Sequence, residues 1–166
     1  MAVINAFQDA NVAAGKKGNP AIVSGGKVLV LAGTFEMAAA DDNGSIYKIG
    51  KLPSNAIPVR ADIINDATAG ATDVDLGLYR ENGVVADKDI LLDGGDLSAG
   101  HAITAPLDGL TNLGGADPIA AVGKKLWELL GLSLETKDSA YDLALTANAA
   151  ASAAGTVSYR VYYILG

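Results

Sequence analysis

Short stretches in which apolar and polar residues alternate, separated by turn-forming residues, fill the chain from Lys27 to its end. The clearest alternation covers 73–79, where valine or leucine at every second position shares one face. Alternation with a period of two residues predicts a β-strand with one buried face. The same argument places Asp73, Asp75 and Tyr79 on the opposite face, and we expect the two carboxylates there to be solvated. Related signals occur at 28–37, 45–52, 56–64, 89–92, 101–104, 141–145 and 156–165.

Glycine and proline divide these stretches and set expectations for their ends. Gly33 interrupts the first stretch, which predicts a strand that is bent or bulged at that point. The Asn-Gly pairs at 43–44 and 82–83 favour turns, because glycine readily adopts positive φ. Pro58 cannot donate a ladder hydrogen bond, so it predicts an edge position or a strand start. The alanine-rich segment 148–155, between the last two strands, is interpreted as a hairpin connection.

One short helix is predicted, over 118–130. Asp117 supplies a side-chain cap, Pro118 suits the first helical position and Gly131 suits the end. Apolar residues recur within it at helical spacing, at positions Ile119, Val122, Leu126, Leu129 and Leu130. Trp127, flanked by these leucines, is interpreted as a core residue.

About eight strands with a single helix exclude a parallel βαβ architecture, because strands and helices do not alternate. The pattern predicts an all-β fold, an antiparallel two-sheet β-sandwich of jelly-roll type with one short helix near 118–130. Residues 1–26 are small, polar and punctuated by glycine, and we interpret them as an extended N-terminal arm. The sandwich domain then covers 27–166.

Composition and charge argue against several functional classes. The 166-residue chain carries a formal net charge of −7, and its three arginines, Arg60, Arg80 and Arg160, lie far apart in sequence. Nucleic-acid binding is therefore not expected. No apolar stretch is long enough to span a membrane, and the N-terminus lacks the basic start and apolar run of a secretory signal. The absence of cysteine excludes disulfides, thiolate nucleophiles and Cys-zinc sites.

Catalytic constellations are not evident. His101 is the only histidine, and it follows Asp96 and Ser98 closely, but no Gly-x-Ser-x-Gly elbow accompanies it. We interpret it as a loop or strand-edge histidine. The nineteen carboxylates could in principle serve glycoside hydrolysis, yet most fall in turns or on strand faces, and one tryptophan offers little for sugar stacking. The expectation is a protein that is not an enzyme and needs no cofactor.

Calcium is the more serious alternative. Asp87-Lys88-Asp89 and Asp93-Gly94-Gly95-Asp96 concentrate oxygen ligands in one region, as calcium requires. The spacing does not match an EF-hand, and Asp-Gly is common in turns, so the turn interpretation is favoured and no metal site is assigned. Asn43-Gly44-Ser45 formally matches a glycosylation acceptor, but a turn is again the simpler interpretation.

The last strand carries a candidate contact surface. Tyr159 and Tyr163 alternate on one face and predict cross-strand packing. Tyr162 lies on the opposite face with Arg160, and tyrosine and arginine are enriched at protein interfaces. We therefore regard Arg160 and Tyr162 as candidate partner-contact residues.

Several blocks in order resemble a known group of proteins. They are GSIYKIGKLP at 44–53 with NAIPV at 55–59, GATDVDLGLY at 70–79, and KLWEL at 125–129 with YDLALTAN at 141–148 and GTV at 155–157. This combination resembles the capsid cement (decoration) proteins of tailed bacteriophages, which have a jelly-roll fold. The resemblance covers roughly 28–165.

The resemblance implies a non-enzymatic protein of the phage virion, made in the bacterial host cytoplasm. Cement proteins bind the capsid exterior and bridge major capsid protein subunits, often as homodimers or homotrimers. Phe7, Lys16 and Lys17 in the N-terminal arm are then candidate shell contacts, beside the alternative that the arm is a disordered tail. A second hypothesis is a β-sandwich binding module of a virion fibre or spike that recognises a carbohydrate or receptor.

Overall fold

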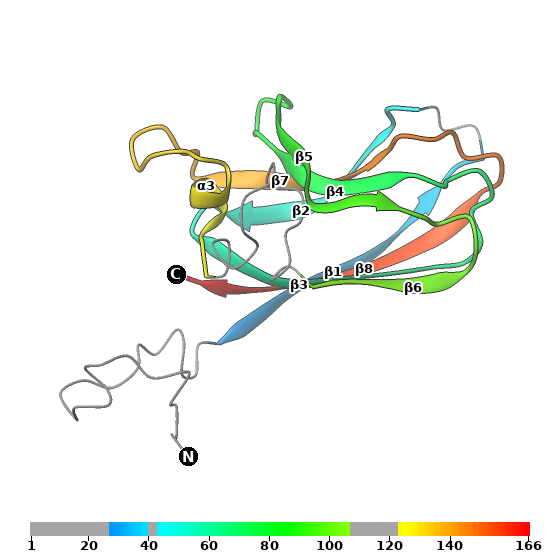
Figure 1. The fold of residues 1–166 in the computed structure, drawn as a ribbon, viewed down its shortest axis with the longest axis horizontal. Coiled ribbons are helices and arrows are strands. Elements are labelled where there is room, and N and C mark those ends of the chain that lie inside the picture. Colours follow the sequence, from blue (N-terminus) through cyan, green and yellow to red (C-terminus); the bar gives the residue numbers. More distant parts are fainter. Residues whose placement is uncertain (1–26, 40–42, 107–122) are drawn as a thin grey trace, which may run out of the picture.

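The computed structural model describes residues 27–39, 43–106 and 123–166. Within these ranges the chain forms two four-stranded antiparallel sheets that lie face to face (Figure 1). The strands are β1 (Val28–Met37), β2 (Ile46–Pro53), β3 (Ala56–Asn65), β4 (Val74–Tyr79), β5 (Val85–Gly95), β6 (His101–Pro106), β7 (Ala140–Ala147) and β8 (Gly155–Leu165). Each expected strand is present, with ends that differ from the predicted ones by a few residues.

The two sheets have the strand orders β1-β8-β3-β6 and β2-β7-β4-β5. No two consecutive strands except β4 and β5 are neighbours within a sheet, so most connections cross from one sheet to the other. Eight antiparallel strands wound in this manner form a double-sheet jelly roll. The predicted fold class is confirmed.

Alternation explains how the core forms between the sheets. On β4 the side chains of Val74, Leu76 and Leu78 are fully buried, and on β8 those of Val157 and Val161 face them from the other sheet.

Aromatic rings close one long side of the sandwich, where strands β1 and β2 meet. There Phe35 stacks on Tyr47 with ring centroids 4.9 Å apart, and Tyr159 donates a hydrogen bond to the Ile49 carbonyl of the other sheet.

Gly33 does not mark a bulge. The ladder between β1 and β8 runs from Val28↔Ile164 to Met37↔Gly155 without a shift in register, so the bulge, one of the two expected alternatives, is absent. A Cβ atom at Gly33 would lie 2.4 Å from the Tyr159 hydroxyl. The glycine is therefore explained by the ring that packs over it.

Pro58 lies near the start of β3, which agrees with a strand start, one of the two positions predicted for it. The strand is internal in its sheet, but its pairing with β6 begins only at Arg60. The ladder with β8 shifts register between Pro58 and Arg60. A proline is tolerated there because the antiparallel strand β6 ends opposite Arg60, so Pro58 lies beyond the β3–β6 ladder.

The segment between β7 and β8 is not a hairpin connection, as the sequence suggested. Strands β7 and β8 belong to different sheets, so residues 148–154 cross from one layer to the other. Backbone hydrogen bonds fix this crossing, since Asn148 donates to the Asp73 carbonyl and Ser152 to the Ala69 carbonyl. Two strands that follow each other closely in the sequence favour a hairpin. Here the strand order of the whole fold places them in different sheets instead.

The short helix α3 spans Leu126–Leu129, so it begins later than expected. Residues 118–122 lie outside the described part of the chain, as does Asp117. Glu128 caps the start by accepting a hydrogen bond of 2.8 Å from the Lys125 amide, and Gly131 has φ of 67°, as expected for a terminating glycine. Leu126 and Leu129 are buried, whereas Trp127 is only half-buried and is not the core residue that the sequence suggested.

The predicted arm, 1–26, also lies outside the described residues and stays a prediction. It would join the sandwich at Lys27, directly before β1. No helix in the described ranges has the length and apolar character needed to cross a membrane.

Candidate binding surfaces

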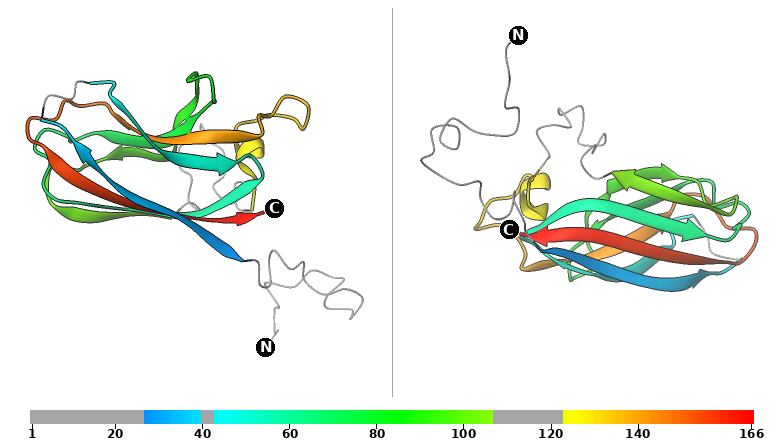
Figure 2. Two further views of the ribbon diagram at one scale, coloured as in Figure 1. Left: turned by 180° about the vertical axis from the view of Figure 1, so that it is seen from behind. Right: turned by 90° about the horizontal axis from the view of Figure 1, so that it is seen from below.

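The outer face of the β1-β8-β3-β6 sheet carries both predicted contact residues that the structure describes. Figure 2 (right) views this sheet from outside, with β8 between β1 and β3. Residues in register share a row across the three strands. One row joins Val30, Tyr162 and Arg60, and the next on the same face joins Ala32, Arg160 and Asp62. Arg160 and Tyr162 therefore point outward from the central part of the face.

Arg60 is stacked on Tyr162. The centre of its guanidinium lies 4.5 Å from the ring centroid, a favourable cation–π geometry. Its Nη2 atom also lies 2.9 Å from Oδ2 of Asp62, on the same face of the same strand. Hydrogen bonding to Tyr162 and the nearby Asp62 carboxylate raise the pKa of Arg60. Arg60, which the sequence did not single out, thus belongs to the same surface as the predicted pair.

Arg160 differs from the other two arginines. Arg60 forms an ion pair with Asp62 and Arg80 one with Asp138, whereas Arg160 forms none with any described residue. Arg160 is exposed. It stands in register with Asp62, whose Oδ1 atom accepts no hydrogen bond within the described ranges. The Arg160 guanidinium is therefore exposed on β8, an inner strand of this sheet.

Apolar side chains extend this face toward the start of β1. Val28 and Val30 are 49% and 51% exposed. They are in register with Ile164 and Tyr162, both half-buried, which continue the apolar area onto β8. We call the surface formed by Val28, Val30, Arg60, Arg160, Tyr162 and Ile164 the arginine face.

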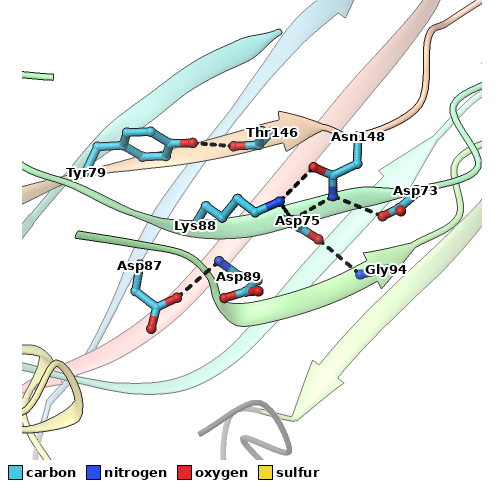
Figure 3. Close-up of polar contacts among 9 residues, drawn as sticks. All are labelled: Asp73, Asp75, Tyr79, Asp87, Lys88, Asp89, Gly94, Thr146 and Asn148. Atoms are coloured by element: carbon cyan, nitrogen blue, oxygen red, sulfur yellow. Dashed lines mark hydrogen bonds and ion pairs between the residues drawn. The ribbon is translucent and has the colours of Figure 1, made fainter. Parts of the chain in front are cut away.

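The opposite outer face, on the β2-β7-β4-β5 sheet, contains a buried carboxylate. Asp75 is 1% exposed, which corrects the expectation that it lies on a solvated face. Its Oδ2 atom lies 3.0 Å from the Lys88 ammonium and accepts a 2.7 Å hydrogen bond from the Asn148 side-chain amide (Figure 3). The Gly94 amide donates to its other oxygen at 3.2 Å.

Strand β5 buries Asp75 by folding over β4. A Cβ atom at Gly77 would lie 2.1 Å from the Lys88 carbonyl carbon, so the backbone of β5 passes directly over this glycine. The β4–β5 ladder jumps from Leu76↔Leu92 to Leu78↔Asp87, which leaves several residues of β5 arched outward. Beside this arch, Tyr79 and Thr146 close the face with a 2.6 Å hydrogen bond between their hydroxyls.

The calcium hypothesis concerns this same region. Asp75, Asp89 and Asp93 each offer a carboxylate oxygen within 4.8 Å of the others. The Lys88 ammonium, 3.0 Å from Asp75, already supplies a positive charge to this group, and the hydrogen bond to Asp75 raises the pKa of Lys88. A cation would have to displace it. We therefore assign no metal site here and retain the interpretation of a structural polar network.

Asp87 is the most strongly perturbed carboxyl group described. Partial burial and a hydrogen bond to Asp89 raise its pKa to about 6. The group titrates between mildly acidic and neutral pH, where most surface carboxylates stay ionised. Asp87 lies within β5, where the Asp89 backbone amide donates a hydrogen bond to it, so we interpret the shift of its pKa as a feature of local packing.

Of the predicted contact residues, the structure describes only Arg160 and Tyr162. Phe7, Lys16 and Lys17 lie outside the described residues, so their role as shell contacts stays a prediction. The backbone of His101 pairs with Asn65 at the start of β6. The register shift at Pro58, which aligns Arg60 with Tyr162, left no signal that sequence patterns alone could detect.

Comparison with known proteins agrees with the fold. No known protein family and no curated protein matches the chain. Its structure is similar to a chain of the cyanophage Pam1 capsid asymmetric unit, with a TM-score of 0.52 and 17% identity over 86% of this chain and 87% of that one. It is likewise similar to a chain in the capsid of Ralstonia phage GP4, with a TM-score of 0.52 and 20% identity over 82% and 84%.

At this level of identity the likeness shows a shared fold, the double-sheet jelly roll. The two coverages are nearly equal in each comparison, so the matched chains are about as long as this one. The sandwich therefore corresponds to nearly a whole chain of each capsid structure and not to one domain of a much larger subunit.

Proposed function

We propose that this protein is a non-enzymatic structural component of a phage virion, a decoration (cement) protein that binds the capsid exterior and bridges major capsid protein subunits. The observation that carries the proposal is the likeness over nearly full length to chains of similar size in two phage capsids. The described residues form one double-sheet β-sandwich, the compact unit on which this proposal rests.

The physical properties of the sandwich support such a role. The side chains of the two sheets interdigitate in a close-packed core. In this proposal the resulting stiff unit transmits load between the subunits that it bridges. In this proposal the protein acts as a homodimer or homotrimer, so that binding of one protomer makes the next contact intramolecular. The net charge of −7 keeps it soluble before assembly.

The predicted arm adds a further contact in this proposal. Residues 1–26 contain Phe7, Lys16 and Lys17, an aromatic and two cationic side chains that would dock on the shell. Ordering such a segment has an entropic cost, and the free energy gained from the docking contacts must exceed that cost. Deleting 1–20 should then weaken attachment and lower the temperature at which particles lose their contents, whereas unchanged particle stability would remove the arm from the proposal.

The molar ratio of this chain to the major capsid protein in purified particles tests the function itself. A shell-covering protein occupies symmetry-related sites and should be present at a fixed ratio, on the order of hundreds of copies per particle, whereas a fibre or spike would number a few tens or fewer. The low ratio would favour the binding module of a fibre or spike that recognises a carbohydrate or receptor.

A further inference from the structure

The two outer faces of the sandwich differ in how their charges are satisfied. On the β2-β7-β4-β5 face, Lys48 pairs with Asp142 at 2.8 Å, Lys51 with Glu81 at 2.7 Å and Lys88 with Asp75 at 3.0 Å. Each described lysine of these strands thus has a carboxylate partner on its own chain. The arginine face holds a cation without such a partner among the described residues, Arg160.

The surroundings of Arg160 suit a contact that excludes water. It stands on β8, between two paired strands, so its backbone position is fixed. Tyr162 lies two residues further along the same strand with Arg60 stacked on it, and the half-exposed Val28 and Val30 lie along the neighbouring strand. Tyrosine, arginine and exposed apolar residues on a rigid support are the composition of an interface hot spot.

Charge identifies the partner's chemistry. The chain carries net charge −7 and only three arginines, yet two of them, Arg60 and Arg160, lie on this one face. Arg60 is neutralised by Asp62, which leaves the Arg160 guanidinium to be matched from outside. The complement of a planar guanidinium is a carboxylate, which accepts two parallel hydrogen bonds from it.

The place where residues 1–26 join the sandwich agrees with this assignment. Lys27 precedes Val28, at the apolar end of the arginine face. The predicted arm would thus leave the sandwich beside this surface. Arm and face would then engage one partner, and each would raise the effective concentration of the other.

We propose that the arginine face is the surface that docks on the shell, onto a subunit that presents an aspartate or glutamate to Arg160 beside apolar side chains facing Val28 and Val30. The inference rests on the proposed function and deepens it. It assigns the β1-β8-β3-β6 sheet to the partner and leaves the internally paired β2-β7-β4-β5 sheet facing solvent.

The experiment measures binding of the purified full-length protein to particles from a phage that lacks its gene. Arg160→Glu should bind about thirtyfold more weakly or worse than the wild type, because it replaces a desolvated charge pair with a repulsion. Arg160→Gln should show an intermediate loss. Both variants should keep the wild-type circular dichroism and melting temperature within a few degrees, since Arg160 forms no described ion pair.

Lys124→Glu is the matched control. Lys124 is exposed, forms no ion pair within the described ranges, lies outside the strands that make up the arginine face and gives the same change of charge. It should bind like the wild type, apart from a small general effect that salt removes. A loss in Lys124→Glu equal to that in Arg160→Glu would overturn the inference, because net charge alone would explain both.

Three further outcomes are decisive. Equal binding by wild type and Arg160→Glu would overturn the docking face and leave the proposed function standing. Failure of the wild type itself to bind would overturn the proposed function and the inference together. If Arg160→Glu changes the mass of the isolated protein in sedimentation equilibrium, the face joins copies of this chain and the shell assignment is wrong.

Discussion

Removing the ammonium group of Lys88 tests whether the Asp75 network stabilises the β2-β7-β4-β5 sheet. In Lys88→Met the aliphatic stem is largely retained, but Asp75, 1% exposed, loses its only counter-charge among the described residues. The side-chain amide of Asn148 and the backbone amide of Gly94 continue to donate to it. The variant removes one charge together with the 2.9 Å hydrogen bond that Lys88 donates to Asn148 Oδ1, while these other hydrogen bonds to Asp75 remain.

The expected loss in the free energy of unfolding follows from how deeply Asp75 and Lys88 are each buried. Removing one partner of a fully buried ion pair costs about 3–5 kcal/mol. The Lys88 side chain is 45% exposed, so water reaches the vacated position, and we expect Lys88→Met to lower the free energy of unfolding by about 2–3 kcal/mol. In an Asp75→Asn background the same change should cost far less, which gives a coupling energy of about 2 kcal/mol.

The assay is equilibrium unfolding in urea for the wild type, both single variants and the double variant, with equal m-values required. Lys48→Met is the matched control, because Lys48 pairs on the same outer face with Asp142, which is 13% exposed against 1% for Asp75 and keeps the Lys51 ammonium 3.8 Å away. That control should cost less than about 1 kcal/mol. A loss in Lys88→Met no larger than in Lys48→Met, or a coupling energy near zero, would refute the reasoning.

Three other predictions concern the same region. Asp87→Asn should stabilise the protein at pH 7 and have little effect at pH 4, because the pKa of Asp87 is raised to about 6 and the folded state holds its proton more tightly than the unfolded state. The stability that this proton provides is present below about pH 4 and lost as pH rises through about 6; for a partly exposed carboxyl we expect about 1 kcal/mol. Melting curves across that range measure it, and parallel pH profiles for wild type and variant would contradict it. Gly77→Ala should cost about 3 kcal/mol or more in urea unfolding, since its Cβ would collide with the backbone of β5, and a cost below about 1 kcal/mol would mean that the arch is displaced easily. Millimolar calcium should shift the melting temperature of the wild type by less than about 1 °C, because the Lys88 ammonium already lies 3.0 Å from Asp75, and a rise of several degrees would revive the calcium site.

The alternation of apolar residues was sufficient to predict the strands and the fold class, since burying one face of each strand leaves few architectures. It was not sufficient for Asp75. The two-residue alternation correctly placed Asp75 on the face opposite Leu76. That face, however, is covered by Lys88, which comes from the outward arch of β5. The one local signal was Gly77, because a glycine inside a strand often marks the close approach of another backbone.

Only part of the arginine face could be assembled from the sequence, and its role as a contact surface stays a proposal. Arg160 and Tyr162 stand two positions apart on one strand, so alternation alone places them on the same face. Arg60 is one hundred residues from Arg160 in sequence, and it reaches Tyr162 only because the β3–β8 ladder shifts register after Pro58. The hairpin expected between β7 and β8 failed because the jelly roll sends consecutive strands to different sheets.

The contrast between the two outer faces explains why a single sandwich would dock with one side only. On the β2-β7-β4-β5 face Lys48, Lys51 and Lys88 are each paired with a carboxylate of the same chain, so a partner would have to break those pairs before it could form new ones. The arginine face offers Arg160 unpaired, with half-exposed valines beside it, so a carboxylate that arrives there accepts hydrogen bonds without displacing any ion pair of the described residues. Docking on this face therefore costs less desolvation and reorganisation for each new hydrogen bond to the partner, which is the condition for a firm attachment through a modest area.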